Sequence, residues 1–188
     1  MARVAIEPYS ERWRADFARL ARRIRSTLGE RAVRIDHIGS TAVPGLAAKD
    51  RIDVQVTVAT LVAANPLARA GFEEIVGFSS DHRPPGAEGP DEDWSKRFFN
   101  APADERSANV HVRLEGRPNQ RYALLFRDYL REHPAAAAAY AELKLRLAAE
   151  LRDVRRYADV KDPACDLIMV AAEDWAVATG WQPGPGDA

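Results

Sequence analysis

Hydrophobic and polar residues alternate most regularly between positions 52 and 58, which predicts a β-strand. Every second residue in this segment is an isoleucine or a valine, as expected of a strand with one buried face. Asp53, Gln55 and Thr57 occupy the positions in between, so their side chains must share the opposite face. We expect any chemistry of this segment to be carried by that polar face.

A polar loop precedes this strand and follows another hydrophobic segment, from Val33 to Ile38. Gly39 and Ser40 begin the loop, and Pro44 and Gly45 disfavour a continuous helix or strand through it. The stretch is therefore expected to form a strand, a loop and a second strand.

A second alternating segment runs from residue 108 to 114 and places Asn109, His111 and Arg113 on one face. We expect it to pair with a strand between Trp94 and Asn100, and its polar row to lie beside the row described above. One such row is typical of an exposed sheet face, whereas two rows next to a Gly-Ser loop favour a functional site.

An amphipathic helix is expected from Tyr9 to Leu28, with Ser10 as its N-cap and Gly29 at its end. Its apolar stripe, which includes Trp13, is expected in the core rather than in a ligand site. Two further elements are expected before residue 77: a short helix between Leu61 and Ala70 that Pro66 begins or interrupts, and a third strand from Phe72 to Val76.

The C-terminal third is expected to be helical, because helix formers and apolar stripes recur there at helical spacing. Prolines and glycines set the expected limits of its elements. The first helix begins at Pro118, and His133-Pro134 separates it from an alanine-rich helix that ends near Leu151. A short connection, 157–162, leads to the last helix, which begins at Pro163 and ends at Gly180, and 183–188 is expected to be disordered.

Residues 79–93 are rich in proline, glycine and acidic side chains, which predicts a mobile surface loop. The loop could be a lid over a site or a solvated insertion. We favour the insertion, and a solvated role for His82, because most loops of this kind have no catalytic role.

Length and charge narrow the class of protein. A chain of 188 residues fits one domain, 1–188, of mixed α+β type. With 27 basic and 28 acidic side chains, its formal net charge is −1, which does not suggest a protein that binds nucleic acid or a membrane surface. A lone Cys165 fits a reducing compartment, and the sequence shows no secretion signal or membrane-spanning run, so we expect a cytoplasmic protein.

The central loop and strand follow the outline of the nucleotidyltransferase superfamily signature. Gly39-Ser40 is followed by twelve residues and then by Asp53 on a strand. In phosphoryl or nucleotidyl transfer, small residues let the backbone approach a triphosphate, and alternating carboxylates hold a divalent metal. Here the second carboxylate position holds Gln55, which brings no negative charge, so Mg²⁺ should bind more weakly.

Each polar residue of this region has an expected role in a transferase. Asp53 would hold the metal, and Gln55 and His111 would complete its coordination or position a substrate hydroxyl, with His111 also a candidate general base. Structural, hydrogen-bonded histidines are an equally good interpretation of His111 and His37. The expected substrate- or phosphate-binding residues are Gly39, Ser40, Thr41, Lys49, Arg113, His37, Asn109 and Lys161, although a solvated role is the stronger expectation for Lys161.

The run from Asp36 to Leu46, with Lys49 and Asp53, resembles the GrpB family of bacterial proteins. Motifs further along the chain resemble the variant found as the C-terminal domain fused to dephospho-CoA kinase: Asn109 to Arg113, Pro118 to Arg121, Leu124 to Asp128, Tyr157 to Asp159, Lys161, Asp174 to Ala176 and Thr179 to Trp181. The resemblance covers nearly the whole chain. It implies a nucleotidyltransferase-like mixed sheet flanked by helices, and no established reaction.

Two departures from the family pattern bear on function. Asp50 stands where members have a proline after the lysine, which places a negative charge beside Lys49 and should weaken polyanion binding. The sequence also lacks a Gly-x-x-x-x-Gly-Lys-Ser/Thr loop, so we do not expect this chain to phosphorylate a coenzyme A precursor.

Two functions therefore remain open. The first is a metal-dependent nucleotidyl or phosphoryl transferase that uses Mg²⁺ and an unidentified nucleotide to act on a small molecule. The second is a catalytically degenerate module that binds a nucleotide or a coenzyme A-like molecule and acts through a separate partner protein.

Overall fold

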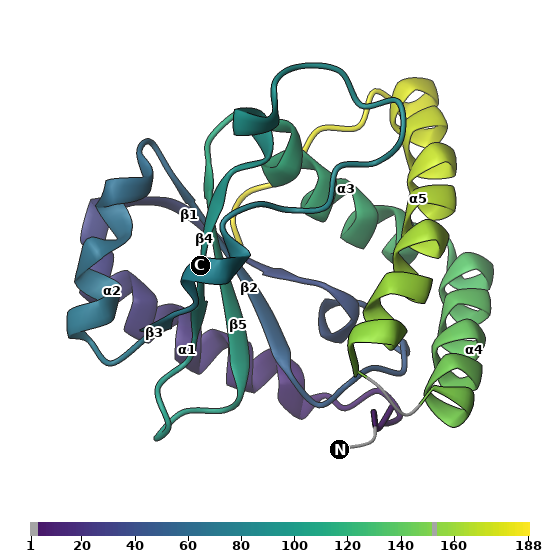
Figure 1. Cartoon of the computed structure of the whole chain (residues 1–188), viewed down its shortest axis with the longest axis horizontal. Helices are drawn as coiled ribbons and strands as arrows, with labels where there is room; N and C mark the ends of the chain where they lie inside the picture. Colours follow the sequence, from purple (N-terminus) through teal and green to yellow (C-terminus); the bar gives the residue numbers. More distant parts are fainter. Residues whose placement is uncertain (1–3, 152–153) are drawn as a thin grey trace.

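A five-stranded mixed sheet forms the centre of this computed structural model, which describes residues 4–151 and 154–188 (Figure 1). The order is β1-β2-β5-β4-β3; β2 and β5 are parallel, and the other neighbours are antiparallel. The strands are β1 (Ala32–Ile38), β2 (Ile52–Val58), β3 (Glu73–Glu74), β4 (Lys96–Asn100) and β5 (Ala108–Leu114).

Two α-helices, α1 (Arg12–Leu28) and α2 (Asn65–Arg69), cover one face of the sheet. Trp13 and Ile24 of α1 and Leu67 of α2 pack in one core with the alternating β-branched residues of β2 and β5. The apolar stripe of α1 is thus in the core, as expected. Short 3₁₀ turns join the elements of the first half: Gly29–Arg31, Ser40–Ala42, Leu61–Ala64, Val76–Phe78 and Asp91–Trp94.

The C-terminal helices α3 (Pro118–Glu132), α4 (Pro134–Glu150) and α5 (Val154–Thr179) lie on the other side, to the right of the sheet in Figure 1. They share a second core to which the loop after β1 contributes Val43 and Leu46. The polar face of β2 is turned towards these helices, because Gln55 donates a hydrogen bond to the backbone of Gln120 in α3.

The expected mixed α/β fold, with a mixed sheet flanked by helices, is confirmed. So is the pairing of the two polar rows: Asp53 lies opposite Asn109, Gln55 opposite His111, and Thr57 opposite Arg113. The β2–β5 register therefore brings together side chains about 56 positions apart in the chain.

Four expected element limits are wrong. Ser10 is not the N-cap of α1, because Glu11 occupies that position and makes no side-chain cap bond. The third strand has only two residues instead of five. Residues 157–162 are not a connection but belong to α5, and Pro163 does not begin this helix but lies inside it. A proline removes one backbone donor, and the packing of α5 on α3 and α4 holds the helix across it.

The segment 183–188, expected to be disordered, instead returns to β1. The backbone N–H of Ala188 donates to the carbonyl of Ile35 at 3.1 Å, and the backbone N–H of His37 donates to Asp187 Oδ2 at 2.9 Å. Arg127 Nη1 lies 3.0 Å from the same carboxylate. These contacts cover the free edge of β1, which composition alone gave no reason to expect.

Within residues 4–151 and 154–188, no helix is both long enough and apolar enough to span a bilayer.

Candidate functional site

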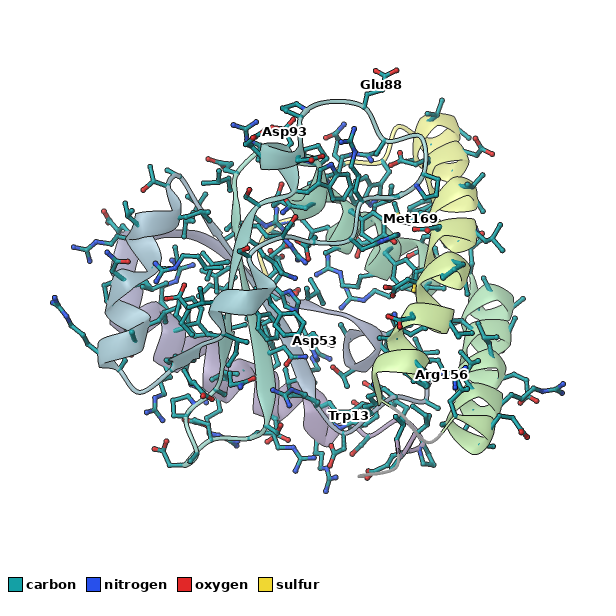
Figure 2. All side chains as sticks on the ribbon, in the orientation of Figure 1. Trp13, Asp53, Glu88, Asp93, Arg156 and Met169 are labelled. Atoms are coloured by element: carbon teal, nitrogen blue, oxygen red, sulfur yellow. The ribbon has the colours of Figure 1, made fainter. Side chains whose placement is uncertain are left out.

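A cavity of about 390 Å³ lies between the polar face of the sheet and the C-terminal helices. Asp53 is on the side of the sheet that faces α5 (Figure 2). Nine of the eleven expected site residues line the cavity: Gly39, Ser40, Thr41, Lys49, Asp53, Asn109, His111, Arg113 and Lys161. His37 and Gln55 do not line it.

Gly39 and Asp53 are in direct contact where β1 ends and β2 begins. Gly39 has a positive φ of 69°, and a Cβ atom at this position would lie 2.6 Å from Asp53 Oδ2. Only glycine satisfies both requirements. The Gly-Ser turn and the strand carboxylate thus face each other, as the superfamily signature predicts.

Hydrogen-bond donors surround the carboxylate of Asp53. Asn109 Nδ2 donates to Oδ1 at 2.7 Å, and His111 Nε2 lies 3.7 Å from the same oxygen. Burial acts to raise the pKa of Asp53, but the interactions with His111 and Asn109 outweigh it and hold the pKa below its usual range. Asp53 is therefore negatively charged at neutral pH.

The position of His111 disfavours a role as general base. Burial lowers its pKa to about 4, so the ring is neutral at pH 7. Its Nδ1 lies 3.3 Å from Arg113 Nη2 and 3.5 Å from Lys96 Nζ. Both neighbours are donors, so Nδ1 holds the lone pair and Nε2 carries the proton, towards Asp53. The basic nitrogen is directed at two cations instead of a substrate.

Gln55 and Arg113 are already paired, which conflicts with the roles expected for them. Arg113 Nη1 donates to Gln55 Oε1 at 2.6 Å, and both side chains are buried. Arg113 also binds Asp81 through two hydrogen bonds, of 2.7 and 2.9 Å. The side-chain oxygen of Gln55 therefore already binds a guanidinium, which disfavours a metal ion at the same oxygen, and the charge of Arg113 is neutralised within the protein.

The loop 79–93 contributes Asp81 and His82 to the cavity wall. Asp81 binds Arg113 and also lies 2.6 Å from Lys96 Nζ. Burial alone would raise its pKa, but these two cations hold it well below the usual range. His82 pairs with Asp166 of α5 at 3.0 Å. The first residues of the loop thus bind the sheet through Asp81 and α5 through His82, so this part of the loop is not the solvated insertion that we favoured.

His37 is a structural residue beneath the Gly-Ser turn, in agreement with one of its two interpretations. Its ring stacks on Phe17 at 4.7 Å, and Nε2 lies 2.9 Å from Thr41 Oγ1. Burial lowers its pKa to about 4, so it is neutral at pH 7. It supports the turn from below and does not contact the cavity.

Three lysines reach the cavity from three elements. Lys49 lies in the loop before β2, with Nζ 4.2 Å from the centre of the Tyr157 ring. Lys144 of α4 donates to Ser40 Oγ at 2.9 Å, and burial together with Lys161 lowers its pKa to about 7. Lys161 of α5 lies 3.3 Å from Cys165 Sγ and 3.5 Å from Asp162, so it is part of the cavity and not a solvated side chain.

Asp50 does not compete for Lys49, contrary to our expectation. Its carboxylate accepts a hydrogen bond from Trp13 Nε1 at 2.7 Å and forms ion pairs with Arg12 and Arg106. The negative charge of Asp50 is therefore paired with cations and with Trp13 of α1, and not with Lys49.

Sequence reasoning missed Asp81, Asn119 and Lys144 in the wall of the cavity. One signal could have pointed to Lys144. Only four of the 27 basic residues are lysines, and three of them line this cavity, while the fourth, Lys96, binds Asp81. A chain that uses arginine almost everywhere else keeps lysine at this site.

The donor set does not fit the magnesium site that the superfamily signature implies. Asp53, at the beginning of β2, is the only carboxylate of that strand, and the Gln55 oxygen is bound by Arg113. Across the described part of the chain, no group of three His, Cys, Asp or Glu side chains could hold a metal ion. Hard divalent cations need several oxygen ligands, and β2 supplies one carboxylate.

A family model and a solved structure identify the same family as similar to this chain. The model of the GrpB protein family matches residues 3–170. A crystal structure of the conserved protein GrpB from Enterococcus faecalis covers 91% of this chain and 99% of its own, with 30% identity and a TM-score of 0.72.

Curated relatives fall into two groups. A dephospho-CoA kinase of Mycolicibacterium paratuberculosis is 38% identical over 97% of this chain and 49% of its own length, so the chain spans about half of it. A UPF0157 protein of Deinococcus radiodurans is 38% identical over 90% of this chain and 82% of its own. With a family match over most of its length, and with relatives of this similarity, the chain belongs to the GrpB family.

Proposed function

We propose that this chain binds a phosphorylated small molecule, such as a nucleotide or a coenzyme A-like compound, through its phosphates and without a divalent metal. This is the binding-module function of the two that the sequence left open. The observation that carries it is the convergence of Lys49, Lys144 and Lys161 on one cavity beside the hydroxyl of Ser40.

The charge of the cavity wall favours an anionic ligand. Five basic and three acidic side chains line it: Lys49, Arg51, Arg113, Lys144 and Lys161 against Asp53, Asp81 and Asp162. Arg113 is neutralised by Asp81, whereas the hydrogen-bond acceptors of Lys144 are a hydroxyl and the backbone carbonyl of Ala47. A buried lysine at the cavity wall whose acceptors are neutral is a ready partner for a phosphate.

Lysine charges also explain how the site can work with one carboxylate. In a metal-dependent transferase, two acidic residues bind cations that neutralise the triphosphate. Here ammonium groups would neutralise the phosphates directly, and Gln55 would strengthen the wall through Arg113. The glutamine that weakens the transferase interpretation is then a structural requirement of the cavity.

The test is thermal stabilisation by inorganic triphosphate, nucleoside triphosphates, coenzyme A and dephospho-coenzyme A, each with magnesium or with EDTA. A ligand at a hundred times its dissociation constant should add about 2.7 kcal/mol to the free energy of unfolding. We expect stabilisation in EDTA that Lys144→Met reduces. Arg146→Met, which removes an exposed charge from the same helix, should leave it unchanged.

The same experiment tests metal-dependent nucleotidyl transfer, which the single carboxylate of β2 disfavours although Asp53 directly faces Gly39. Stabilisation by one triphosphate only in the presence of magnesium, lost in Asp53→Asn, would favour it over metal-free binding. Stabilisation by none of these compounds would contradict both, and would favour an accessory role through a partner protein.

A further inference from the structure

A row of four aromatic rings leads along the cavity from Lys144. Lys144 Nζ lies 4.7 Å from the centre of the Tyr140 ring, and the successive ring centres are 5.7 to 6.3 Å apart. The row consists of Tyr140, Phe126, Tyr122 and Trp94, all of which line the cavity. A ligand with its phosphates at the lysines would extend along flat apolar surfaces.

Two buried polar atoms stand at the far end of this row. Trp94 Nε1 and Asn119 Oδ1 have no hydrogen-bond partner among the residues that the structure describes. Both side chains line the cavity, and both residues are almost fully buried, at 4% and 1% exposure. Since buried polar groups are nearly always paired in native proteins, these two require an explanation.

The chemical identity of these two atoms is fixed by their surroundings. Asn119 Nδ2 donates to Asp81 Oδ2 at 3.1 Å and to the carbonyl of Ser95 at 3.0 Å. Both partners are acceptors, so a flipped amide would place oxygen against oxygen. Asn119 therefore offers an acceptor, and the indole of Trp94 can only donate.

We propose that this part of the cavity recognises a planar heterocycle whose edge carries a hydrogen-bond donor beside an acceptor, as every nucleobase does. Asn119 Oδ1 accepts the hydrogen bond of the donor on this edge, whether a ring N–H or an exocyclic amino group, Trp94 Nε1 donates to the acceptor beside it, and Tyr122 provides a flat neighbouring surface. The inference rests on the proposed function and deepens it: of the phosphorylated compounds considered above, the ligand is a nucleotide or a nucleotide-containing cofactor.

The test compares ligands that differ only in the ring. Binding of the four common nucleoside triphosphates, ribose 5-triphosphate and the four nucleosides is measured by calorimetry in EDTA, for the wild type, Trp94→Phe and Trp175→Phe. Trp94→Phe keeps an aromatic ring and removes the indole N–H. Trp175 packs against Tyr129 and His133, outside the lining of the cavity, and serves as the control.

We expect at least one nucleoside triphosphate to bind more tightly than ribose 5-triphosphate. Trp94→Phe should weaken the binding of that nucleotide roughly three- to tenfold, the range for one hydrogen bond, and leave the affinity for ribose 5-triphosphate unchanged. The wild-type comparison alone decides the question if Trp94→Phe does not fold.

Equal affinity of nucleotides and ribose 5-triphosphate in the wild type would overturn the heterocycle site while leaving phosphate binding intact. Nucleoside binding that Trp94→Phe weakens, without any binding of ribose 5-triphosphate, would support the heterocycle site and overturn the proposed phosphate site. Binding of neither class of compound would overturn both.

Discussion

Lys144 Nζ and Ser40 Oγ are 2.9 Å apart, although 104 positions separate them in the chain. The contact joins the middle of α4 to the turn after β1, so it links the C-terminal helical third directly to the Gly-Ser loop. Burial and the nearby Lys161 lower the pKa of Lys144 to about 7. The ammonium group is thus close to half-protonated at neutral pH in the free protein.

Phosphate binding should therefore be coupled to proton uptake by Lys144. A bound anion favours the ammonium form, so at pH 8 the complex should take up protons that the free protein lacks. Triphosphate affinity should fall as the pH rises from 6.5 to 8.5. Calorimetry in two buffers of different ionisation enthalpy measures the uptake, and Lys144→Met should abolish most of it; an unchanged uptake in this variant would assign the proton to another group.

The sequence predicted which strand residues lie together on the polar face of the candidate site. Alternation assigned Asp53, Asn109, His111 and Arg113 to one polar face, and the parallel pairing of β2 with β5 makes those positions direct neighbours. Strand periodicity fixes which way a side chain points, so this part follows from local pattern. The loop that begins at Gly39 and Ser40 was also predictable from local sequence, because Pro44 and Gly45 disfavour a continuous helix or strand there.

The rest of the site depends on how helices and loops pack, which periodicity does not encode. Lys144 is in an alanine-rich helix with a weak polar pattern, and Asp81 is in a loop that composition marks as exposed. Partners also changed the expected roles of residues that were placed correctly: Arg113 is bound by Asp81, and the lone pair of His111 faces Lys96. The type of residue at a site predicts its chemistry only when its neighbours are known.

Gly39→Ala should destabilise the protein more than Gly45→Ala. Both glycines have a positive φ, of 69° and 77°, but a Cβ at Gly39 would collide with Asp53 Oδ2, whereas one at Gly45 meets no atom within 4 Å. Backbone strain alone should lower the free energy of unfolding by about 1 kcal/mol in Gly45→Ala, and the collision should add about 1–3 kcal/mol in Gly39→Ala. Urea unfolding of the two variants tests this; equal losses would show that the Asp53 side chain moves aside freely.

Acid should destabilise the protein as the pH falls from 6.5 towards 4, before most carboxylates titrate. The pKa values of His37 and His111 are about 4 in the folded protein and near 6.5 when unfolded. Over this interval the unfolded chain binds more protons, so the free energy of unfolding decreases as the pH falls.

Urea midpoints at pH 7, 5.5 and 4.5 measure the effect, and His37→Gln should flatten the dependence by about 1–3 kcal/mol. His82→Gln, at an exposed side chain that pairs with Asp166, is the matched control and should retain the wild-type slope. A slope that His37→Gln leaves unchanged would mean that the ring is solvated and protonates freely.

Asp187→Ala should lower stability although the residue is only one position from the end of the sequence. The carboxylate accepts the backbone N–H of His37 and pairs with Arg127, whose side chain is only 4% exposed. Its removal leaves a buried backbone donor and part of a buried guanidinium without a partner, which should cost about 1–3 kcal/mol.

Asp91→Ala is the control: it removes a carboxylate that is 91% exposed and paired with Arg83, so it should change stability by less than about 0.5 kcal/mol. Equal urea midpoints for the two variants would show that the segment 183–188 does not stabilise the β1 edge, and hydrogen exchange at the His37 amide, which should accelerate in Asp187→Ala alone, tests the same contact directly.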